Sequence, residues 1–393
     1  MLRSEYDVVV IGCGPAGSTA ARFAAAGGAS VLILERDREP GIPVRCGEGV
    51  PERLLQEFLS IDKKWISSKI TEAQIFSPDG ASAISGNNGT GYILERRIFD
   101  AELANIACEA GADLITKADA TGLVYENNQI TGVKYRYMGK EELVVCKLVI
   151  GADGVESRVG RWAGIKTDIT LKDIHTSVQY TVCNLNISAK TIQFHFGNKI
   201  APGGYAWVFP KSSSTANIGV GVAADKLKEN SIKYYLDKFI NEKFPEAKIS
   251  CQICGGIPLT DGSNTIYTDG MMLVGDAARQ INPITGGGIF QGMIAGKIAG
   301  ELAAEAVKKN RFDADFLVKY RKAWDKKLGN VHKLHYKLKQ RFYNMSDERY
   351  NRFVAQCKEI PADKSNLKTI FLHVLKNNPA MLVKAARGFL MGK

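Results

Sequence analysis

The chain has 393 residues, 45% hydrophobic and 24% charged, which is ordinary for a globular protein with room for two domains. Its net charge of +11 favours an anionic membrane surface or an acidic partner over nucleic acid, because no nucleic-acid-binding module is present. No apolar run approaches the roughly 20 residues that cross a bilayer, and the first ten residues lead straight into a strand. We therefore expect no signal peptide and a cytoplasmic location.

The first motif lies at the N-terminus. Residues 8–11 form a continuous apolar run, typical of a buried parallel strand. Three glycines with G-x-G-x-x-G spacing follow: Gly12, Gly14 and Gly17. This spacing provides a tight turn, a close approach to a pyrophosphate, and close packing of the next helix. Residues 31–34 read as the second strand, and Glu35 at its end is placed to accept hydrogen bonds from ribose hydroxyls.

The middle of the chain alternates between two kinds of strand. Residues 148–151 read as a parallel strand that ends in Ala152-Asp153-Gly154. By contrast, residues 176–183, 191–196 and 217–223 are rich in β-branched residues and predict an antiparallel sheet over the cofactor.

A second motif, near residue 275, decides between cofactors. Residues 271–274 predict another buried strand, and Gly275-Asp276 a turn. The glycines Gly286, Gly287 and Gly288 precede a predicted helix from Ile289 to about residue 307. Asp276 can hold a ribityl hydroxyl, and the helix N-terminus favours the negative charge that develops on a reduced flavin. NAD would fit the first motif equally well, but the two motifs together predict FAD.

The eight cysteines are expected to be mostly reduced. Cys108, Cys146 and Cys183 are predicted to be core residues. Cys251 and Cys254 form the only close pair, which is either a redox disulfide or, as we favour, structural or incidental. No metal site is predicted, since the histidines His332, His335 and His373 lack metal-ligand spacing.

The predicted fold class is α/β with mixed α+β character, in three parts. A discontinuous, Rossmann-like, three-layer FAD-binding domain comprises residues 1–70, 95–165 and 262–308. An antiparallel-sheet substrate domain comprises residues 71–94 and 166–261. Residues 309–393 form a C-terminal helical region.

Several segments resemble a known family. The GxGPAG, GADG and GDAARQINPITGGGI segments are similar to flavoproteins of the aromatic hydroxylase type. Residues 43–49 (PVRCGEG) resemble the cysteine loop of geranylgeranyl reductases, and residues 202–210 match their P-x-x-Y-x-W-x-F-P motif at every fixed position. Within that family the chain is most similar to the archaeal digeranylgeranylglycerophospholipid reductases. The resemblance covers nearly the whole chain.

The resemblance implies a set of flavin contacts. Ala16 would lie in the phosphate loop and Glu35 on the ribose. Cys46, Gly47 and Gly49, with Arg45 beside them, would lie near the isoalloxazine ring. Arg96, which has Arg97 as its neighbour, and Ala120 match positions on the adenine side. Asp276, Gly287, Gly288 and Ile289 match the pyrophosphate-to-flavin end.

Tyr205, Trp207 and Phe209 alternate along one predicted strand and therefore share a face. A prenyl chain offers only van der Waals contact, so an aromatic wall suits it, although an ordinary sheet core would use the same residues. We favour the substrate wall.

Cys46 is the candidate catalytic residue. It either relays a proton to the alkene, with Arg45 lowering its pKa, or only shapes the space beside the flavin. Glu48 reads as a further acid or, more commonly, as an exposed loop residue.

The absence of a second G-x-G-x-x-G segment argues against a resident nicotinamide domain. The flavin's donor would then be ferredoxin or a transiently bound nicotinamide or deazaflavin.

The C-terminal region predicts basic amphipathic helices. An apolar stripe runs through Leu328, Val331, His335, Leu338 and Phe342, with Lys326, Lys327, Lys333, Lys337, Lys339 and Arg341 around it. Residues 366–376 and 379–393 add further stripes. Such helices either lie in a lipid headgroup layer or are surface helices with a solvated charged face. We favour contact with the inner face of the cell membrane.

Together with these observations, the resemblance implies an FAD-dependent reductase that saturates the geranylgeranyl chains of archaeal ether glycerophospholipids. The alternatives are a reductase of geranylgeranyl diphosphate or of a chlorophyll precursor, an NAD(P)H-dependent flavin monooxygenase, and a flavin electron carrier to a quinone. The carrier usually contains an iron–sulfur cysteine cluster, which this sequence lacks.

Overall fold

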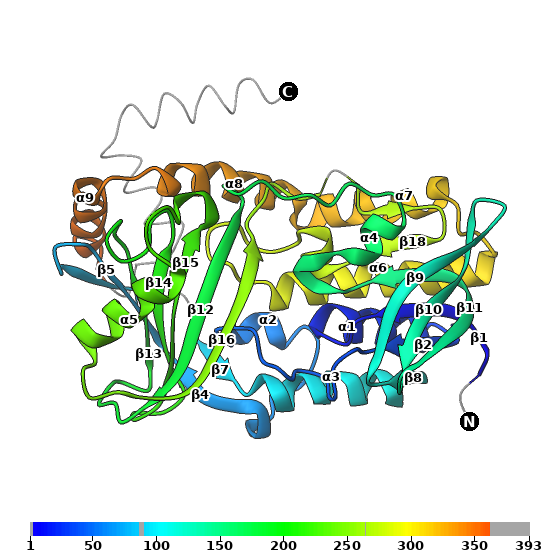
Figure 1. The fold of residues 1–393 in the computed structure, drawn as a ribbon, viewed down its shortest axis with the longest axis horizontal. Coiled ribbons are helices and arrows are strands. Elements are labelled where there is room, and N and C mark those ends of the chain that lie inside the picture. The colour runs from blue at the N-terminus through cyan, green and yellow to red at the C-terminus, as the bar shows by residue number, and fades with distance from the viewer. Residues whose placement is uncertain (1–2, 86–89, 264, 362–393) are drawn as a thin grey trace.

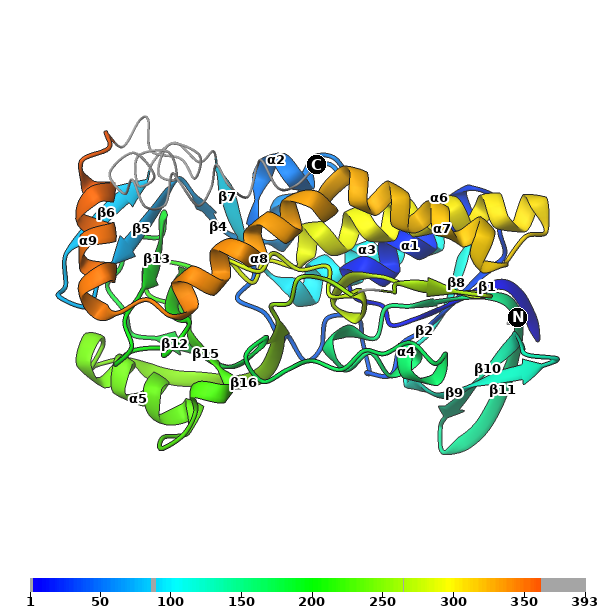
Figure 2. The same ribbon diagram turned by 90° about the horizontal axis from the view of Figure 1, so that it is seen from above.

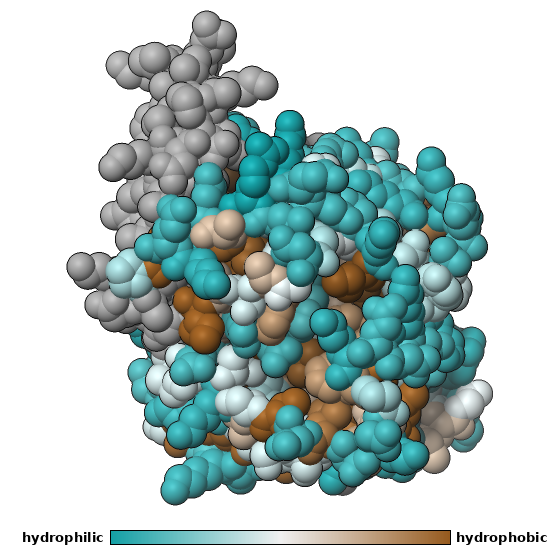
Figure 3. Space-filling model, turned by 90° about the vertical axis from the view of Figure 1, so that its left-hand side faces the viewer, coloured by the Kyte–Doolittle hydropathy of each residue, from teal (hydrophilic) through white to brown (hydrophobic). Residues whose placement is uncertain are grey.

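A computed structural model describes residues 3–85, 90–263 and 265–361. It has two sheet-based parts that lie side by side along the long axis, and helix α8 (Asn330–Tyr343) runs over both of them (Figure 1). Seen from the end formed by α9 (Asp347–Lys358), β5 (Glu72–Phe76) and α5 (Ile232–Lys243), the surface is largely polar, with apolar side chains showing in small patches (Figure 3).

The first part is built on an eight-stranded sheet. Its strands are β1 (Glu5–Ile11), β2 (Val31–Leu34), β8 (Ala112–Ile115), β9 (Ala118–Glu126), β10 (Gln129–Tyr137), β11 (Lys140–Gly151), β17 (Tyr267–Thr268) and β18 (Met271–Leu273). The order is β17-β18-β11-β1-β2-β8, and in addition β10 pairs with β11 and with β9. The central strands β18, β11, β1, β2 and β8 run parallel. Each residue of β2 is buried, as expected for a parallel strand covered on both faces.

Helices α1 (Pro15–Ala26) and α3 (Arg96–Glu109) pack on this sheet, and α6 (Ile289–Lys309) packs on α1. Helix α6 approaches α1 closely because it presents glycines to it. A Cβ on Gly296 would lie 2.3 Å from the Ala16 carbonyl oxygen, and one on Gly300 would lie 2.3 Å from that of Ala20. This contact holds together the two helices whose N-termini come from the two predicted cofactor motifs.

The second part is a seven-stranded sheet with the order β16-β12-β15-β14-β13-β5-β6. Besides β5, its strands are β6 (Ser82–Ser85), β12 (Ile174–Cys183), β13 (Thr191–His195), β14 (Tyr205–Pro210), β15 (Ala216–Ala223) and β16 (Lys248–Pro258). Helix α5 covers its outer face, where Val178, Tyr180 and Phe239 belong to a separate apolar core. Helix α9 lies beside β6 at one end (Figure 2).

A small three-stranded sheet joins the two parts. It contains β3 (Gly49–Pro51), β7 (Gly91–Leu94) and β4 (Ile66–Ile70), and the short helix α2 (Glu52–Leu55) follows β3. The expected domain boundaries at residues 70 and 95 assign β4 and β7 to different domains, whereas the two strands pair with each other. Short strands without strong alternation gave no sign of this partnership in the sequence.

After α6 the chain is helical, as expected, through α7 (Ala314–Trp324), a π-helical turn (Asp325–Gly329), α8 and α9. The inward face of α8 differs from the predicted apolar stripe. Its buried residues are His332, Lys339 and Tyr343, whereas Val331 is 47% exposed and the neighbouring Leu334 51%. The apolar stripe did not predict this face because α8 packs on polar groups of the second sheet's strand ends. Residues 366–376 and 379–393 lie outside the described residues.

Candidate FAD and substrate site

The turn between β1 and α1 forms the phosphate loop. Gly12 has φ +102°, and a Cβ there would lie 2.4 Å from the Ala152 carbonyl oxygen. A Cβ on Gly17 would lie 1.9 Å from the Gly12 carbonyl oxygen. A Cβ on Gly14, in contrast, would meet no protein atom within 4 Å, because this residue faces an open cavity. The loop therefore leaves space in front of the helix N-terminus, where a pyrophosphate binds in this motif.

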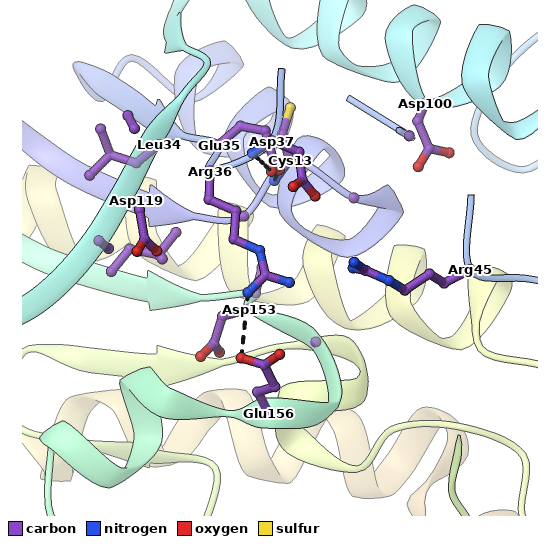
Figure 4. Close-up of a pocket in the computed structure, with 18 of the residues that line it drawn as sticks. Cys13, Leu34, Glu35, Arg36, Asp37, Arg45, Asp100, Asp119, Asp153 and Glu156 are labelled. Carbon is purple, nitrogen blue, oxygen red and sulfur yellow. Dashed lines mark hydrogen bonds and ion pairs between the residues drawn. The ribbon is translucent and has the colours of Figure 1, made fainter. Parts of the chain in front are cut away.

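Glu35 lies at the end of β2. Its carboxylate accepts hydrogen bonds from the backbone N–H groups of Cys13 at 2.7 Å and Asp37 at 2.8 Å. Burial raises the pKa of this carboxyl group, and the two backbone donors oppose the rise. The carboxylate is thus held in place at the wall of a cavity of about 270 Å³ (Figure 4).

Other charged residues line the same cavity, and sequence reasoning assigned them no role: Arg36, Asp37, Asp119, Asp153, Glu156 and Arg158. Arg36 reaches across to Glu156 with an N–O distance of 3.4 Å (Figure 4). Asp153, from the GADG segment, has a buried Oδ1 without a hydrogen-bond partner among the described residues. Arg96 and Ala120 line this cavity too, whereas Arg97 is exposed.

The second motif forms the wall of an adjoining cavity of about 560 Å³. Asp276 lies in a short 3-10 turn (Gly275–Ala278), and α6 begins directly after Gly288. A Cβ on Gly288 would lie 3.0 Å from Asp276 Oδ1, a tight approach that a larger residue would meet only if the Asp276 side chain shifted. Burial raises the pKa of Asp276, while Arg279 lowers it. Ala16, Arg45, Cys46, Gly47 and Ile289 line this cavity as well, whereas Gly49 and Gly287, which the resemblance also placed at the flavin, line only a third cavity, next to the aromatic residues of β14.

The two cavities share Gly14, Arg36, Arg45, Arg96 and Asp153, so they form one continuous space between the motifs. FAD fits this space on the chain's own features: an open helix N-terminus at Gly14, a fixed acid at Glu35, and the unpaired buried Asp153 oxygen. The dinucleotide would lie between Glu35 and Asp276, with its flavin end toward Cys46 and α6.

The cysteine loop packs against the predicted aromatic wall. A Cβ on Gly47 would lie 2.9 Å from the Phe209 ring, and one on Gly49 would lie 3.2 Å from it. The Gln179 side chain donates to the Cys46 carbonyl oxygen at 3.0 Å and accepts from Trp207 Nε1 at 2.9 Å. Gln179 thus connects the loop to the wall, a role without any sequence signal.

Cys46 is half-buried, and burial raises the pKa of its thiol. The cation that opposes this rise is Arg96, whereas the expected one was Arg45, which is exposed and points into the cofactor cavity (Figure 4). The prediction that Arg45 lowers this pKa is therefore wrong. Glu48 also differs from its interpretation as an exposed loop residue, because it is only 3% exposed.

Tyr205, Trp207 and Phe209 share one face of β14 and line a third cavity, of about 330 Å³. The Trp207 ring lies over Gly219, where a Cβ would be 2.3 Å from Trp207 Cζ2. Tyr205 donates its hydroxyl hydrogen to the Thr285 carbonyl oxygen at 2.5 Å, directly before the Gly286–Gly288 segment. This cavity adjoins the flavin-end cavity, because the two share the lining residues Cys46, Gly47, Trp207, Gly288 and Ile289.

The remaining cysteine and histidine predictions have mixed outcomes. Cys146 is buried as predicted, but Cys108 is exposed and Cys183 only half-buried. Cys251 and Cys254 lie three positions apart on β16, so their side chains point to opposite faces and cannot form a disulfide. Among the described residues no group of histidine, cysteine and acidic side chains could hold a metal ion. His332 is buried against the Thr260 carbonyl oxygen at 3.0 Å, and His373 lies outside the described residues.

Comparisons with known proteins agree with this geometry. A family model described as the geranylgeranyl reductase catalytic domain matches residues 173–257, and one described as pyridine nucleotide-disulphide oxidoreductase matches residues 6–183. The chain is 40% identical to digeranylgeranylglycerophospholipid reductase 1 of Methanococcoides burtonii, over 97% of this chain and 94% of that protein. It is 42% identical to the digeranylgeranylglycerophospholipid reductase of Methanocella arvoryzae, over 97% of this chain and 98% of that protein.

Solved structures give the same picture. A geranylgeranyl bacteriochlorophyll reductase-like protein from Thermoplasma acidophilum superposes with a TM-score of 0.93 at 35% identity, over 98% of this chain and 99% of that one. A myxobacterial FAD-dependent halogenase matches with a TM-score of 0.67 at 18% identity, over 96% of this chain and 97% of that one, and shows the fold alone.

The fold and site therefore define an FAD-dependent oxidoreductase, which confirms the predicted cofactor and fold class. The chain belongs to the digeranylgeranylglycerophospholipid reductase family, as its cysteine loop and aromatic motif indicated.

Proposed function

We propose that the protein saturates carbon–carbon double bonds in the geranylgeranyl chains of archaeal ether glycerophospholipids. The observation that carries the proposal is the aromatic-lined cavity adjoining the flavin end of the cofactor site, with Cys46 and Gly47 in the wall of both. An apolar cavity with few polar groups suits a ligand that offers only hydrocarbon surface. The names of the relatives supply the substrate class.

In this proposal FAD, once bound and reduced by the electron donor, would supply the hydride that adds to one carbon of the double bond. The chain's own residues bind the prenyl chain, exclude water and deliver a proton to the other carbon. Tyr205, Trp207 and Phe209 would hold the chain by van der Waals contact. Burial keeps the Cys46 thiol protonated at neutral pH, so it can act as the proton donor, and Arg96 would stabilise the thiolate that remains.

The test is an anaerobic single-turnover experiment. The protein is loaded with FAD, reduced with dithionite and mixed with digeranylgeranylglyceryl phosphate, and both flavin absorbance and lipid mass are followed. Flavin reoxidation together with lipid products heavier in steps of two hydrogens is the expected result. No reoxidation by this lipid, combined with oxygen-dependent NADPH consumption on an aromatic substrate, would replace the proposal with a monooxygenase. Turnover of geranylgeranyl diphosphate alone would change the substrate.

Two further proposals concern the electron donor of the flavin and the contact with the membrane. We propose an acidic ferredoxin as donor, supported by the net charge of +11, with a transiently bound nicotinamide or deazaflavin as the other source. In the described residues no helix is both long and apolar enough to span a bilayer. Contact with the inner face of the membrane would therefore be peripheral.

The outer face of α8 supports the membrane proposal. Residues 326–346 contain no acidic side chain. The lysines Lys326, Lys327, Lys333 and Lys337 are exposed there, together with Val331 and Leu334. Exposed lysines near an anionic surface contribute about 1 kcal/mol each, and the apolar side chains between them can enter the headgroup layer.

Charge reversal tests this surface. The double variant Lys333→Glu, Lys337→Glu should bind vesicles of anionic phospholipid about tenfold or more weakly in a sedimentation assay. The matched control reverses two exposed lysines elsewhere, Lys228→Glu and Lys248→Glu, and should bind within about twofold of the wild type. Equal losses in both variants would show that net charge alone, and not α8, governs binding.

A further inference from the structure

Glu48 is a non-glycine residue in a left-handed backbone conformation inside the cysteine loop. Its φ is +71°, and its neighbours Gly47 and Gly49 provide the close approach to Phe209. Only a few per cent of non-glycine residues adopt positive φ, and glycine would occupy this position with less strain. The side chain must therefore supply something that glycine could not.

The Glu48 carboxylate is only 4% exposed and is fully engaged. One oxygen accepts the backbone N–H of Arg96 at 2.8 Å. The other accepts Lys211 Nζ at 2.7 Å and Asn217 Nδ2 at 2.6 Å. The backbone carbonyl of Glu48 also accepts the N–H of Leu94 at 2.9 Å. The carboxylate thus joins the loop to the start of α3 and to residues at the end of β14 and the start of β15.

These partners belong to the elements that form the site. Arg96, whose main-chain N–H binds Glu48, is also the cation that acts on the Cys46 thiol. Lys211 directly follows β14, which carries Phe209, and Asn217 pairs with Phe209 across β14 and β15. A movement of the carboxylate would therefore shift the thiol relative to Arg96 and to the aromatic wall together.

We propose that Glu48 is a positioning residue that holds Cys46 in register with Arg96 and the aromatic wall. The inference rests on the proposed function only for its catalytic consequence, since the geometry of the thiol can be measured without any lipid. Glu48 is fully bonded and held by a lysine, so it is not itself the proton donor.

The test is Glu48→Gln in the FAD-loaded protein. The glutamine amide group would face the N–H donors of Arg96, Lys211 or Asn217, so at least one bond is lost. We expect iodoacetamide to alkylate Cys46 about tenfold faster, measured at the Cys46 peptide by mass spectrometry, because the loop opens. We also expect the pH profile of this reaction to shift and lipid-dependent flavin reoxidation at saturating lipid to slow about tenfold.

The chain offers a matched control. Lys211 also pairs with Glu95 at 2.8 Å, but the Glu95 side chain is 42% exposed. Glu95→Gln removes that outer pair without touching the loop, so both rates should stay within about twofold of the wild type. Lys211→Met removes the positive charge that pairs with the Glu48 carboxylate, so it should loosen the cysteine loop as Glu48→Gln does. If Glu48→Gln does not fold, Lys211→Met tests the proposal in its place. The combination Glu48→Gln, Lys211→Met should be less impaired than the sum of the single changes.

A folded Glu48→Gln protein with Cys46 alkylation and its pH profile as in the wild type would overturn the inference. Normal alkylation in the controls with no lipid turnover in any variant, including the wild type, would instead contradict the proposed function. Faster alkylation with unchanged turnover would show that Cys46 is held by Glu48 but that its position does not matter to the reaction.

Discussion

At the scale of single residues, the glycines of the phosphate loop have different roles although they belong to one motif: some leave space for the ligand and others allow the backbone to pack. A Cβ on Gly14 would enter the cofactor cavity, whereas a Cβ on Gly17 would collide with the Gly12 backbone. Gly14→Ala should therefore leave the melting temperature of the FAD-free protein unchanged but weaken FAD binding about tenfold or more, measured by fluorescence titration. The Gly14 φ of −75° also accommodates alanine without strain.

The comparison variant is Gly17→Ala. Its Cβ would lie 1.9 Å from a backbone oxygen, so α1 must shift and the protein without FAD should melt at a lower temperature. If Gly14→Ala also lowered that temperature, the space in front of Gly14 would serve folding and not the ligand.

The role of a residue was predictable from the sequence where a local backbone rule applies, and it was not predictable where the role depends on a long-range contact. Gly12, Gly17 and Glu35 follow from backbone needs at fixed spacing, so the sequence was sufficient. Gln179 was not predictable, because its partners are distant in sequence: β12 and β14 both pair with β15, which brings Trp207 to Gln179, and Cys46 comes from the cysteine loop. The interpretation of Glu48 as exposed was wrong for the same reason: the donors that permit its burial come from residues 96, 211 and 217.

At the scale of elements, β14 can present a wall only because β15 makes room for it. The Trp207 ring lies on Gly219, where a Cβ would be 2.3 Å from Cζ2, while a Cβ on Gly221 would be 3.7 Å from Cζ3, an ordinary contact. Gly219→Ala should push the ring into the cavity and raise the KM for lipid about tenfold, with FAD absorbance unchanged.

Gly221→Ala is the matched change on the same strand, and it should leave the KM within about twofold of the wild type. Equal KM values for the two variants would mean that the Trp207 ring does not contact the bound chain. A lower melting temperature for Gly219→Ala without a change in KM would assign the aromatic face to ordinary sheet packing.

Element type was predictable along most of the described chain, and element orientation less so. Residues 31–34, 191–196 and 217–223 are strands in the structure within one residue of the predicted limits, and α6 begins at Ile289 as predicted. Helix α8 exists, and its inward face is polar, with His332, Lys339 and Tyr343 as its buried residues, which the periodicity of the apolar residues did not predict. Its buried Lys339 binds Asp173 at 3.0 Å, and Tyr336 also donates to Asp173. A stripe of hydrophobic residues predicts burial only where the opposing surface is apolar, and here it is a set of charged strand ends.

At the scale of the whole molecule, the junction between the two parts is polar and therefore sensitive to pH. His175, on β12, lies at this junction, where four charged side chains act on its imidazole ring: Lys339, Asp225, Asp173 and Lys226. Burial is the main cause that lowers its pKa to about 3, with Lys339 as the next. His195, on β13, is stacked on Phe76 with ring centroids 4.2 Å apart, and burial lowers its pKa to about 3 as well.

The direction of the pH effect follows from proton binding. Each histidine is neutral in the folded state but has a pKa of about 6.5 when unfolded, so between pH 6.5 and 3 the unfolded chain binds more protons. The stability that depends on these neutral histidines is complete above pH 6.5 and is lost as the pH falls. The loss is about 1.4 kcal/mol per pH unit per histidine, or about 2 kcal/mol for His175 at pH 5.

The variant His175→Gln isolates the contribution of His175 to the pH dependence of stability. The variant should be less stable than the wild type at pH 7, because a buried aromatic ring is replaced, but its further loss between pH 7 and 5 should be smaller by about 2 kcal/mol. Urea unfolding of both proteins at the two pH values measures the difference. An equal loss in both proteins would mean that His175 is hydrated or paired in solution, and that the polar contact between α8 and the second sheet does not carry the acid sensitivity of the fold.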